Sequence, residues 1–344
     1  MIRFLDSSEV TNGCKSWYLD KVIRDNRRRD NVNTSNSFDR HKVVILKVTE
    51  EDIEGLLLNH DLNDDGKYSY MEHEFVDAVM RYLPEYAMGD EPVPKDIIDL
   101  VPYLKETAKS VVKIKRITEI KKYIDENVPY DQWDEKMLDI YSSKGIFSEL
   151  ILHFLLRAIH KTTPLISKIY FKDSFAHEAH GFDSVHVTDD NRLWLGETKF
   201  YNDSKRGIKA LIDDLNTHFK HDYLKEQFVI INRALSHKNP EREAWIEKLN
   251  SAERLEEKLE LMVVPLLCIY EDNIATKVIN AINEGTDSEA LVLDHMTAMK
   301  EYFEKNNTFV HKDRVQTLLI LLPVECKKRI VSEMLTRICN MQGI

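Results

Sequence analysis

Charged side chains alternate with apolar ones in the segment GFDSVHVTDDNRLWLGETKF, residues 181–200. Successive side chains of a β-strand point to opposite faces, so Glu197 and Lys199 share a face if this segment is extended. Asp183 alternates in the same way with two valines on the preceding apolar run. A turn-type cluster, Thr-Asp-Asp-Asn, separates the two runs and predicts a β-hairpin.

The length of the turn decides whether these side chains meet. A three-residue loop that ends at Asn191 pairs Val187 with Leu193. By alternation it then pairs Asp183 with Glu197, and directly opposed residues lie on the same face. A two-residue loop would shift the register by one and send Asp183 to the other face. Because Asn tolerates the left-handed conformation with which a three-residue loop ends, the sequence favours the first register.

Two opposed carboxylates and an amine indicate a cation site that can act on a phosphate. The carboxylates of Asp183 and Glu197 repel unless a cation or proton lies between them. Oxygen ligands without cysteine suit Mg²⁺ or Mn²⁺, and the carbonyl of Thr198 is a further candidate ligand. Lys199 could orient the attacking water and offset charge on a phosphate. The alternative is an ordinary surface pair on a half-exposed strand.

A further candidate is Glu149, which lies in an apolar segment that predicts a helix over residues 144–160. An unpaired buried carboxylate is costly, so Glu149 should meet a partner, and it could orient a second ion. The alternative is a narrow polar stripe that faces water.

These residues together resemble a known nuclease pattern. Glu149 on a helix, Asp183 on one strand and Glu197-Thr198-Lys199 on the next are similar to the PD-(D/E)XK signature. More narrowly, GFDSVHV followed by LWLGETKFY resembles the HamA family, the effector subunit of Hachiman anti-phage defence, and the related AbpA proteins. The resemblance covers roughly residues 140–340. One departure is Ser148, which precedes Glu149 where a small residue such as Gly is expected.

The resemblance implies a restriction-endonuclease-like core in which Asp183 and Glu197 bind the metal and Lys199 assists catalysis. It also implies a partner helicase, HamB, that restrains the nuclease until phage infection or damaged DNA releases it. The expected protein is therefore a Mg²⁺-dependent DNA nuclease. Two alternatives remain: a calcium-responsive interaction protein without catalysis, and a stand-alone restriction or repair nuclease.

The surrounding elements predict an α/β protein with two domains. Residues 1–139 are mainly helical in pattern, whereas strands alternate with helices over residues 140–344. The expected strands are residues 169–173, 182–187, 192–200, 228–231, 262–270 and 317–322. The expected helices between and after them are residues 207–223, residues 241–259 and a final helix that ends near Met341.

The segment DLNDDGKYSYME, residues 61–72, fits the EF-hand calcium loop. Its candidate Ca²⁺ ligands are Asp61, Asn63, Asp65, Lys67 through its carbonyl, and Glu72. Helix-like segments flank it, at residues 50–59 and 72–82. The alternative is an Asp/Asn/Gly-rich turn, which the same residues favour.

Charge and hydropathy restrict the partners. The formal net charge of −11 argues against a protein that coats nucleic acid by itself. A basic cluster that includes Lys105, Lys109, Lys113 and Arg116 is either a solvated face or a docking strip for DNA or an acidic partner. No apolar stretch reaches the roughly 18 residues of a membrane helix, and no secretory signal is apparent, so a cytoplasmic protein without membrane contact is expected.

Overall fold

The computed structural model describes residues 43–49, 52–89, 93–112, 117–142, 145–166, 181–190, 192–235 and 254–343, all within one compact unit. Several sequence predictions lie outside these ranges. They are the strand over residues 169–173, the conformation of Asn191, most of the helix over residues 241–259, and the basic residues Lys113 and Arg116.

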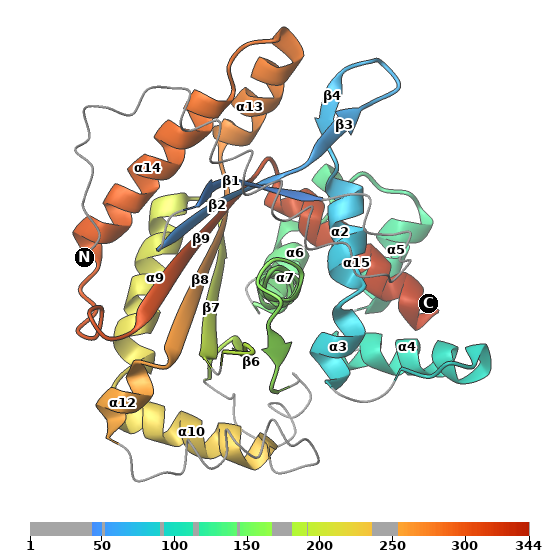
Figure 1. Cartoon of the computed structure of the whole chain (residues 1–344). Coiled ribbons are helices and arrows are strands. Elements are labelled where there is room, and N and C mark those ends of the chain that lie inside the picture. Colours follow the sequence, from blue (N-terminus) through green and yellow to red (C-terminus); the bar gives the residue numbers. More distant parts are fainter. Residues whose placement is uncertain are drawn as a thin grey trace. The chain divides into compact units, whose positions relative to one another are not determined.

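A seven-stranded mixed sheet forms the centre of this unit, with the strand order β1–β2–β9–β8–β7–β6–β5 (Figure 1). The inner strands β2, β9, β8 and β7 are parallel, whereas β1 at one edge and β6 and β5 at the other are antiparallel to their neighbours. The strands are β1 (Val44–Thr49), β2 (Ile53–Leu58), β5 (Thr163–Pro164), β6 (Ser184–Val187), β7 (Leu193–Tyr201), β8 (Met262–Glu271) and β9 (Gln316–Val324).

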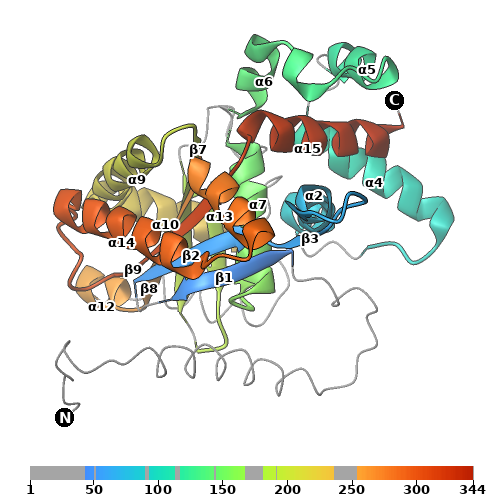
Figure 2. The same ribbon diagram turned by 90° about the horizontal axis from the view of Figure 1, so that it is seen from above.

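Helices cover both faces of the sheet, and each face has its own apolar core (Figures 1 and 2). One face packs on α7 (Ile146–Ala158), with α2 (Glu72–Met80) and α15 (Lys327–Gln342) beyond it. The other packs on α9 (Ser204–His218), with α13 (Asn273–Glu284) and α14 (Glu289–Asn306) nearby. The remaining helices are α3 (Leu83–Met88), α4 (Ile97–Val111), α5 (Ile117–Asp125), α6 (Glu135–Ser142), α10 (His221–Leu235), α12 (Leu255–Leu259) and a 3-10 turn (Tyr130–Gln132).

The α/β class predicted from the sequence is confirmed. Strands β6, β7, β8 and β9 and helices α7 and α15 lie within a few residues of their predicted positions. The expected strand over residues 228–231 is wrong, because these residues belong to α10. Leu224, Phe228 and Ile231 are buried at helical spacing while Val229 is exposed, which is the pattern of an amphipathic helix.

The mainly helical N-terminal half is not confirmed. Residues 53–58, expected as part of a helix, form the inner strand β2, which pairs with β9 near the end of the chain. All six residues of β2 are buried. Its apolar residues Ile53, Leu56 and Leu57 stand at a spacing that a helix also gives, so such a short pattern does not distinguish a buried strand from a helix. The central sheet therefore contains strands from both ends of the described chain.

The calcium-loop segment is a β-hairpin, so the predicted helix–loop–helix arrangement is wrong. Strands β3 (His60–Leu62) and β4 (Tyr68–Tyr70) pair antiparallel. Asn63 closes the turn: its side-chain oxygen accepts the backbone N–H groups of Asp65 at 3.1 Å and Lys67 at 2.9 Å. Glu72, at the start of α2, is buried and forms an ion pair with Arg329. Calcium binding by this loop stays a prediction.

Candidate active site

The register of the central hairpin is the predicted one. Strand β6 pairs with β7 through Val187 opposite Leu193 and Val185 opposite Leu195. The turn between them therefore has the predicted odd length. The pairing ends at Ser184 opposite Gly196, so Asp183 lies just before the paired residues and its predicted pairing with Glu197 stays a prediction. Gly196 lets this strand approach α7, since a Cβ atom there would lie 2.6 Å from Leu152 Cδ2 on that helix.

Asp183 lies against strand β7. Its backbone N–H donates to the carbonyl of Gly196 at 2.9 Å. Its Oδ2 accepts the backbone N–H of Thr198 at 2.8 Å and lies 3.0 Å from the Thr198 hydroxyl. The same hydroxyl lies 2.9 Å from the hydroxyl of Ser148 on α7. Ser148, the departure from the expected small residue, therefore connects the helix to the hairpin.

Glu197 is 2% exposed, and its carboxylate forms a hydrogen bond with Nδ1 of His218, the last residue of α9. The imidazole ring stacks on Tyr223, with centroids 4.7 Å apart and planes at 6°, and meets the edge of Phe182. Burial lowers the pKa of His218 below its usual value, although the charges of Asp214 and Asp183 oppose this shift.

Lys199 on β7 forms an ion pair with Asp214 on α9. Burial alone would lower the pKa of Lys199, but the Asp214 hydrogen bond and charge, then the charges of Glu197 and Asp183, outweigh it and raise the pKa. The amine is therefore charged and lies within electrostatic reach of both candidate metal ligands. The structure thus brings Asp183, Glu197, Thr198 and Lys199 together.

The sequence analysis missed Asp214 and His218. They lie four residues apart, so they share one side of α9, beside the buried stripe of Leu211 and Leu215. An acid and a histidine at this spacing, on a helix that directly follows the acidic strand, were the signal that could have identified them.

Glu149 lies on the other face of the sheet, and the prediction that it meets a partner is confirmed, whereas the alternative of a water-facing stripe is wrong. It is 4% exposed, and its Oε2 accepts the hydroxyl of Tyr86 at 2.6 Å. Gly145 makes room for it, because a Cβ atom there would lie 3.1 Å from Glu149 Oε1. Burial raises the pKa of Tyr86, and the charges of Glu149 and Asp183 raise it further. The phenol therefore bonds to Glu149 and lies within electrostatic range of Asp183.

Helix α3 holds the polar stripe of α7 to which Glu149 belongs. Glu85 is the neighbour of Tyr86 on this helix. Its Oε2 lies 3.1 Å from His153 Nε2 and accepts the Nε–H of Arg157 at 2.9 Å. His153 and Arg157 follow Glu149 at four-residue intervals, so the whole stripe faces α3. An element of the first 139 residues thus fixes the helix that carries a candidate catalytic carboxylate.

The donor atoms fit a hard cation with few protein ligands. Among the residues that the structure describes, no three His, Cys, Asp or Glu side chains form a ready-made metal cluster. Mg²⁺ commonly uses one or two carboxylates and keeps several waters, and Asp183 with Glu197 suits this pattern.

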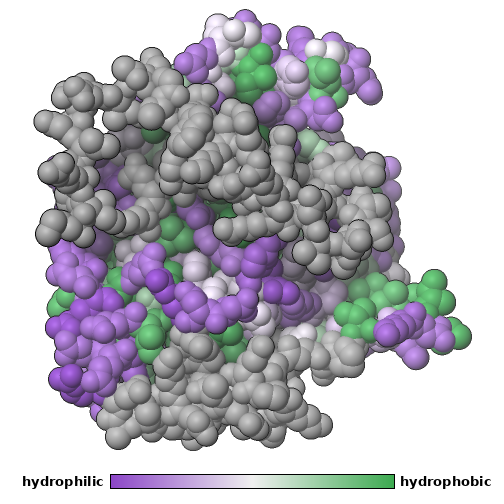
Figure 3. All heavy atoms as spheres, in the orientation of Figure 1, coloured by the Kyte–Doolittle hydropathy of each residue, from purple (hydrophilic) through white to green (hydrophobic). Residues whose placement is uncertain are grey.

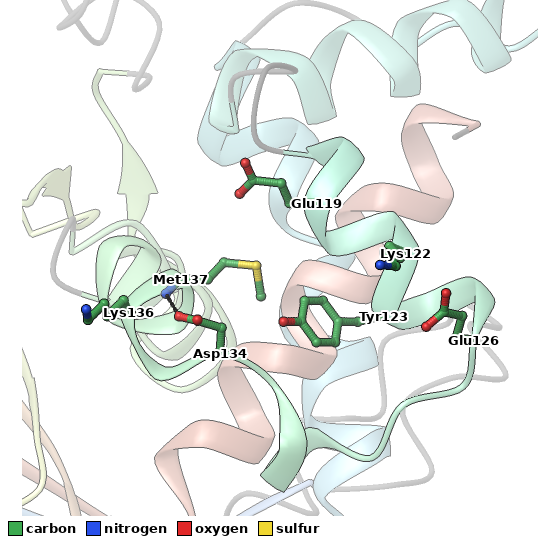
Figure 4. Close-up of a pocket in the computed structure, with 7 residues that line it drawn as sticks. All are labelled: Glu119, Lys122, Tyr123, Glu126, Asp134, Lys136 and Met137. Carbon is green, nitrogen blue, oxygen red and sulfur yellow. Dashed lines mark hydrogen bonds between the residues drawn. The ribbon is translucent and has the colours of Figure 1, made fainter.

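The other candidate contacts lie apart from this centre. Lys105 is exposed on α4, and Lys109 forms an ion pair with Glu106 at 2.5 Å. A pocket of about 510 Å³ lies between α5 and α6, where Tyr123 and Met137 line it (Figure 4). It contains none of the predicted site residues.

The protein has a mixed α/β fold with two carboxylates at the β6–β7 hairpin. Comparison with known protein families identifies it further. The family HamA matches residues 35–338, nearly the whole chain, so this protein belongs to the HamA family. Membership indicates a component of Hachiman defence. No curated protein and no solved structure matches the chain. Across the described residues, no helix is long and apolar enough to cross a membrane.

The Tyr86–Glu149 hydrogen bond yields a stability prediction. Tyr86→Phe removes a donor to a buried carboxylate, and we expect it to lower the free energy of unfolding by about 1.5–3 kcal/mol. Urea denaturation followed by circular dichroism measures the change. Tyr302→Phe, at a partly buried tyrosine outside this site, should change stability by less than about 0.5 kcal/mol. Equal stabilities for Tyr86→Phe and the wild type would contradict the assigned role.

Proposed function

We propose that this HamA-family protein is a Mg²⁺- or Mn²⁺-dependent DNA endonuclease, the effector of an anti-phage system in which a helicase partner restrains it. The observation that carries the proposal is the hairpin register. It gathers Asp183, Glu197 and Lys199 at one end of a buried strand pair. Carboxylates beside a charged amine are what phosphodiester hydrolysis with a divalent cation requires.

Each side chain has a separate role in the proposed reaction. Asp183, Glu197 and the carbonyl of Thr198 would hold the cation, and Glu149 would orient a second ion. When bound, such a cation activates water and withdraws charge from the phosphate. Lys199 positions the attacking water and stabilises the negative charge that develops on the phosphate. The site is partly buried, and this strengthens these electrostatic interactions relative to bulk water.

Two properties of the chain support a partner. The net charge of −11 disfavours tight DNA binding by the chain alone. In addition, Ile97, Ile98 and Val101 at the start of α4 are 73%, 76% and 63% exposed. Hydrophobic residues gather there on the surface (Figure 3). Contiguous exposed apolar side chains are typical of binding surfaces, so we propose this end of α4 as part of the helicase contact.

Cleavage of plasmid DNA by the purified chain tests the nuclease. We expect cutting with Mg²⁺ or Mn²⁺ and none after EDTA. Lys199→Met should lower the cleavage rate about 10²- to 10³-fold, because it removes a charge that stabilises the transition state. Lys209→Met, at an exposed lysine on α9, should cut at the wild-type rate. A wild-type chain that cuts no DNA with either metal, or a fully active Lys199→Met, contradicts the proposal.

Co-purification with the helicase subunit tests the contact. Ile98→Glu places a charge in the exposed apolar group, and we expect it to weaken the complex at least tenfold, about 1.4 kcal/mol. Thermal unfolding of the variant alone should stay unchanged, since the side chain is exposed. Val310→Glu, at an apolar residue that is 82% exposed elsewhere, is the matched control. Retention of the helicase by both variants would exclude α4 from the contact.

A further inference from the structure

Helix α9 contacts both charged residues of strand β7, Glu197 and Lys199. It packs along β7 and β8, and its residues Asp214 and His218 lie one turn apart. Lys199 and Glu197 are two residues apart on β7, so their side chains point to the same face. One helical turn and two strand residues span similar lengths, about 5.4 Å and 6.6 Å. Each member of the strand pair therefore has its own partner on the helix.

The position of His218 is fixed from two sides. Tyr223, from the start of α10, stacks on one face of its ring, and the edge of Phe182 approaches at 5.8 Å between centroids. This packing leaves the imidazole little freedom to rotate. Its Nδ1 faces Oε1 of Glu197, so the ring sets the direction of that carboxylate.

Asp214 acts on Lys199 in a comparable way. A lysine amine lies at the end of a flexible four-carbon chain, and an ion pair restricts where it points. The ammonium group has three donors. A bond to Asp214 uses one of them, and the others can serve a water or a phosphate oxygen. The side chains of Lys199 and Asp214 are 23% and 25% exposed, so the pair is partly shielded from solvent.

We infer that α9 is the positioning helix of the active site: His218 orients the Glu197 carboxylate for the divalent cation, and Asp214 directs the Lys199 amine at the scissile phosphate. The inference rests on the proposed nuclease function and adds two residues to it. Neither touches the substrate, so both are positioning residues. Partners of metal ligands typically change metal affinity or activity by about 10- to 100-fold when they are removed.

Calorimetric titration of the full chain with Mn²⁺ tests the role of His218. His218→Asn keeps a nitrogen donor at the position of Nδ1, and His218→Leu has a similar size without a donor. We expect His218→Leu to bind Mn²⁺ about 10- to 100-fold more weakly and His218→Asn to recover most of the affinity. His221→Leu, at an exposed histidine three residues later, should match the wild type. Thermal unfolding without metal checks that each variant is folded.

Cleavage kinetics test the role of Asp214. Asp214→Asn should lower kcat about tenfold or more while Mn²⁺ affinity and KM stay within about threefold, because it releases the amine and removes no metal ligand. Asp213→Asn, at the exposed neighbouring acid, should behave as the wild type. Asp214→Glu, which keeps the ion pair, should recover part of kcat.

The outcomes separate this inference from the proposed function. A wild-type chain that neither binds Mn²⁺ nor cuts DNA overturns both. If the wild type binds and cuts, equal Mn²⁺ affinities for His218→Leu and His218→Asn overturn the role of His218 alone. An unchanged kcat for Asp214→Asn overturns the role of Asp214.

Discussion

Repulsion between carboxylates on a buried strand pair is the constraint on which the rest of this structure depends. Asp183 and Glu197 come close because the hairpin pairs Ser184 with Gly196, the residues next to them, and Asp183 then bonds to Thr198. Negative charges held close together in a medium of low dielectric are unfavourable unless each has a partner. The elements around the hairpin supply these partners, and the fold is best understood as the scaffold that does so.

Because side chains alternate along β7, the partners of this strand come from two helices. Thr198 points toward α7 and meets Ser148, whereas Glu197 and Lys199 on either side of it point toward α9 and meet His218 and Asp214. Glu149 on α7 is held in turn by Tyr86 from α3. Sequence-distant segments thus converge on one centre, and a change in α3 or α9 can alter the site without touching its motif residues.

The hairpin was predictable because alternation and turn length are local properties, and they determine the register of Asp183 and Glu197. The partners were not, because they depend on tertiary packing. Nothing near Tyr86 indicates that it meets Glu149, and the apolar residues of β2 stand at a spacing that a helix would also give. Asn63 illustrates a different ambiguity: the residues that ligate calcium in one loop close a hairpin turn in another.

Anomalous diffraction from crystals soaked in Mn²⁺ tests the central claim most directly. A cation that compensates the two carboxylates should give one strong peak between Asp183 and Glu197, with ligand distances near the roughly 2.0–2.2 Å of small divalent ions bound to oxygen. His218 should remain bonded to Glu197. A peak at the hairpin of residues 60–70 with none at this centre, or side chains of Asp183 and Glu197 that point apart, would contradict the account.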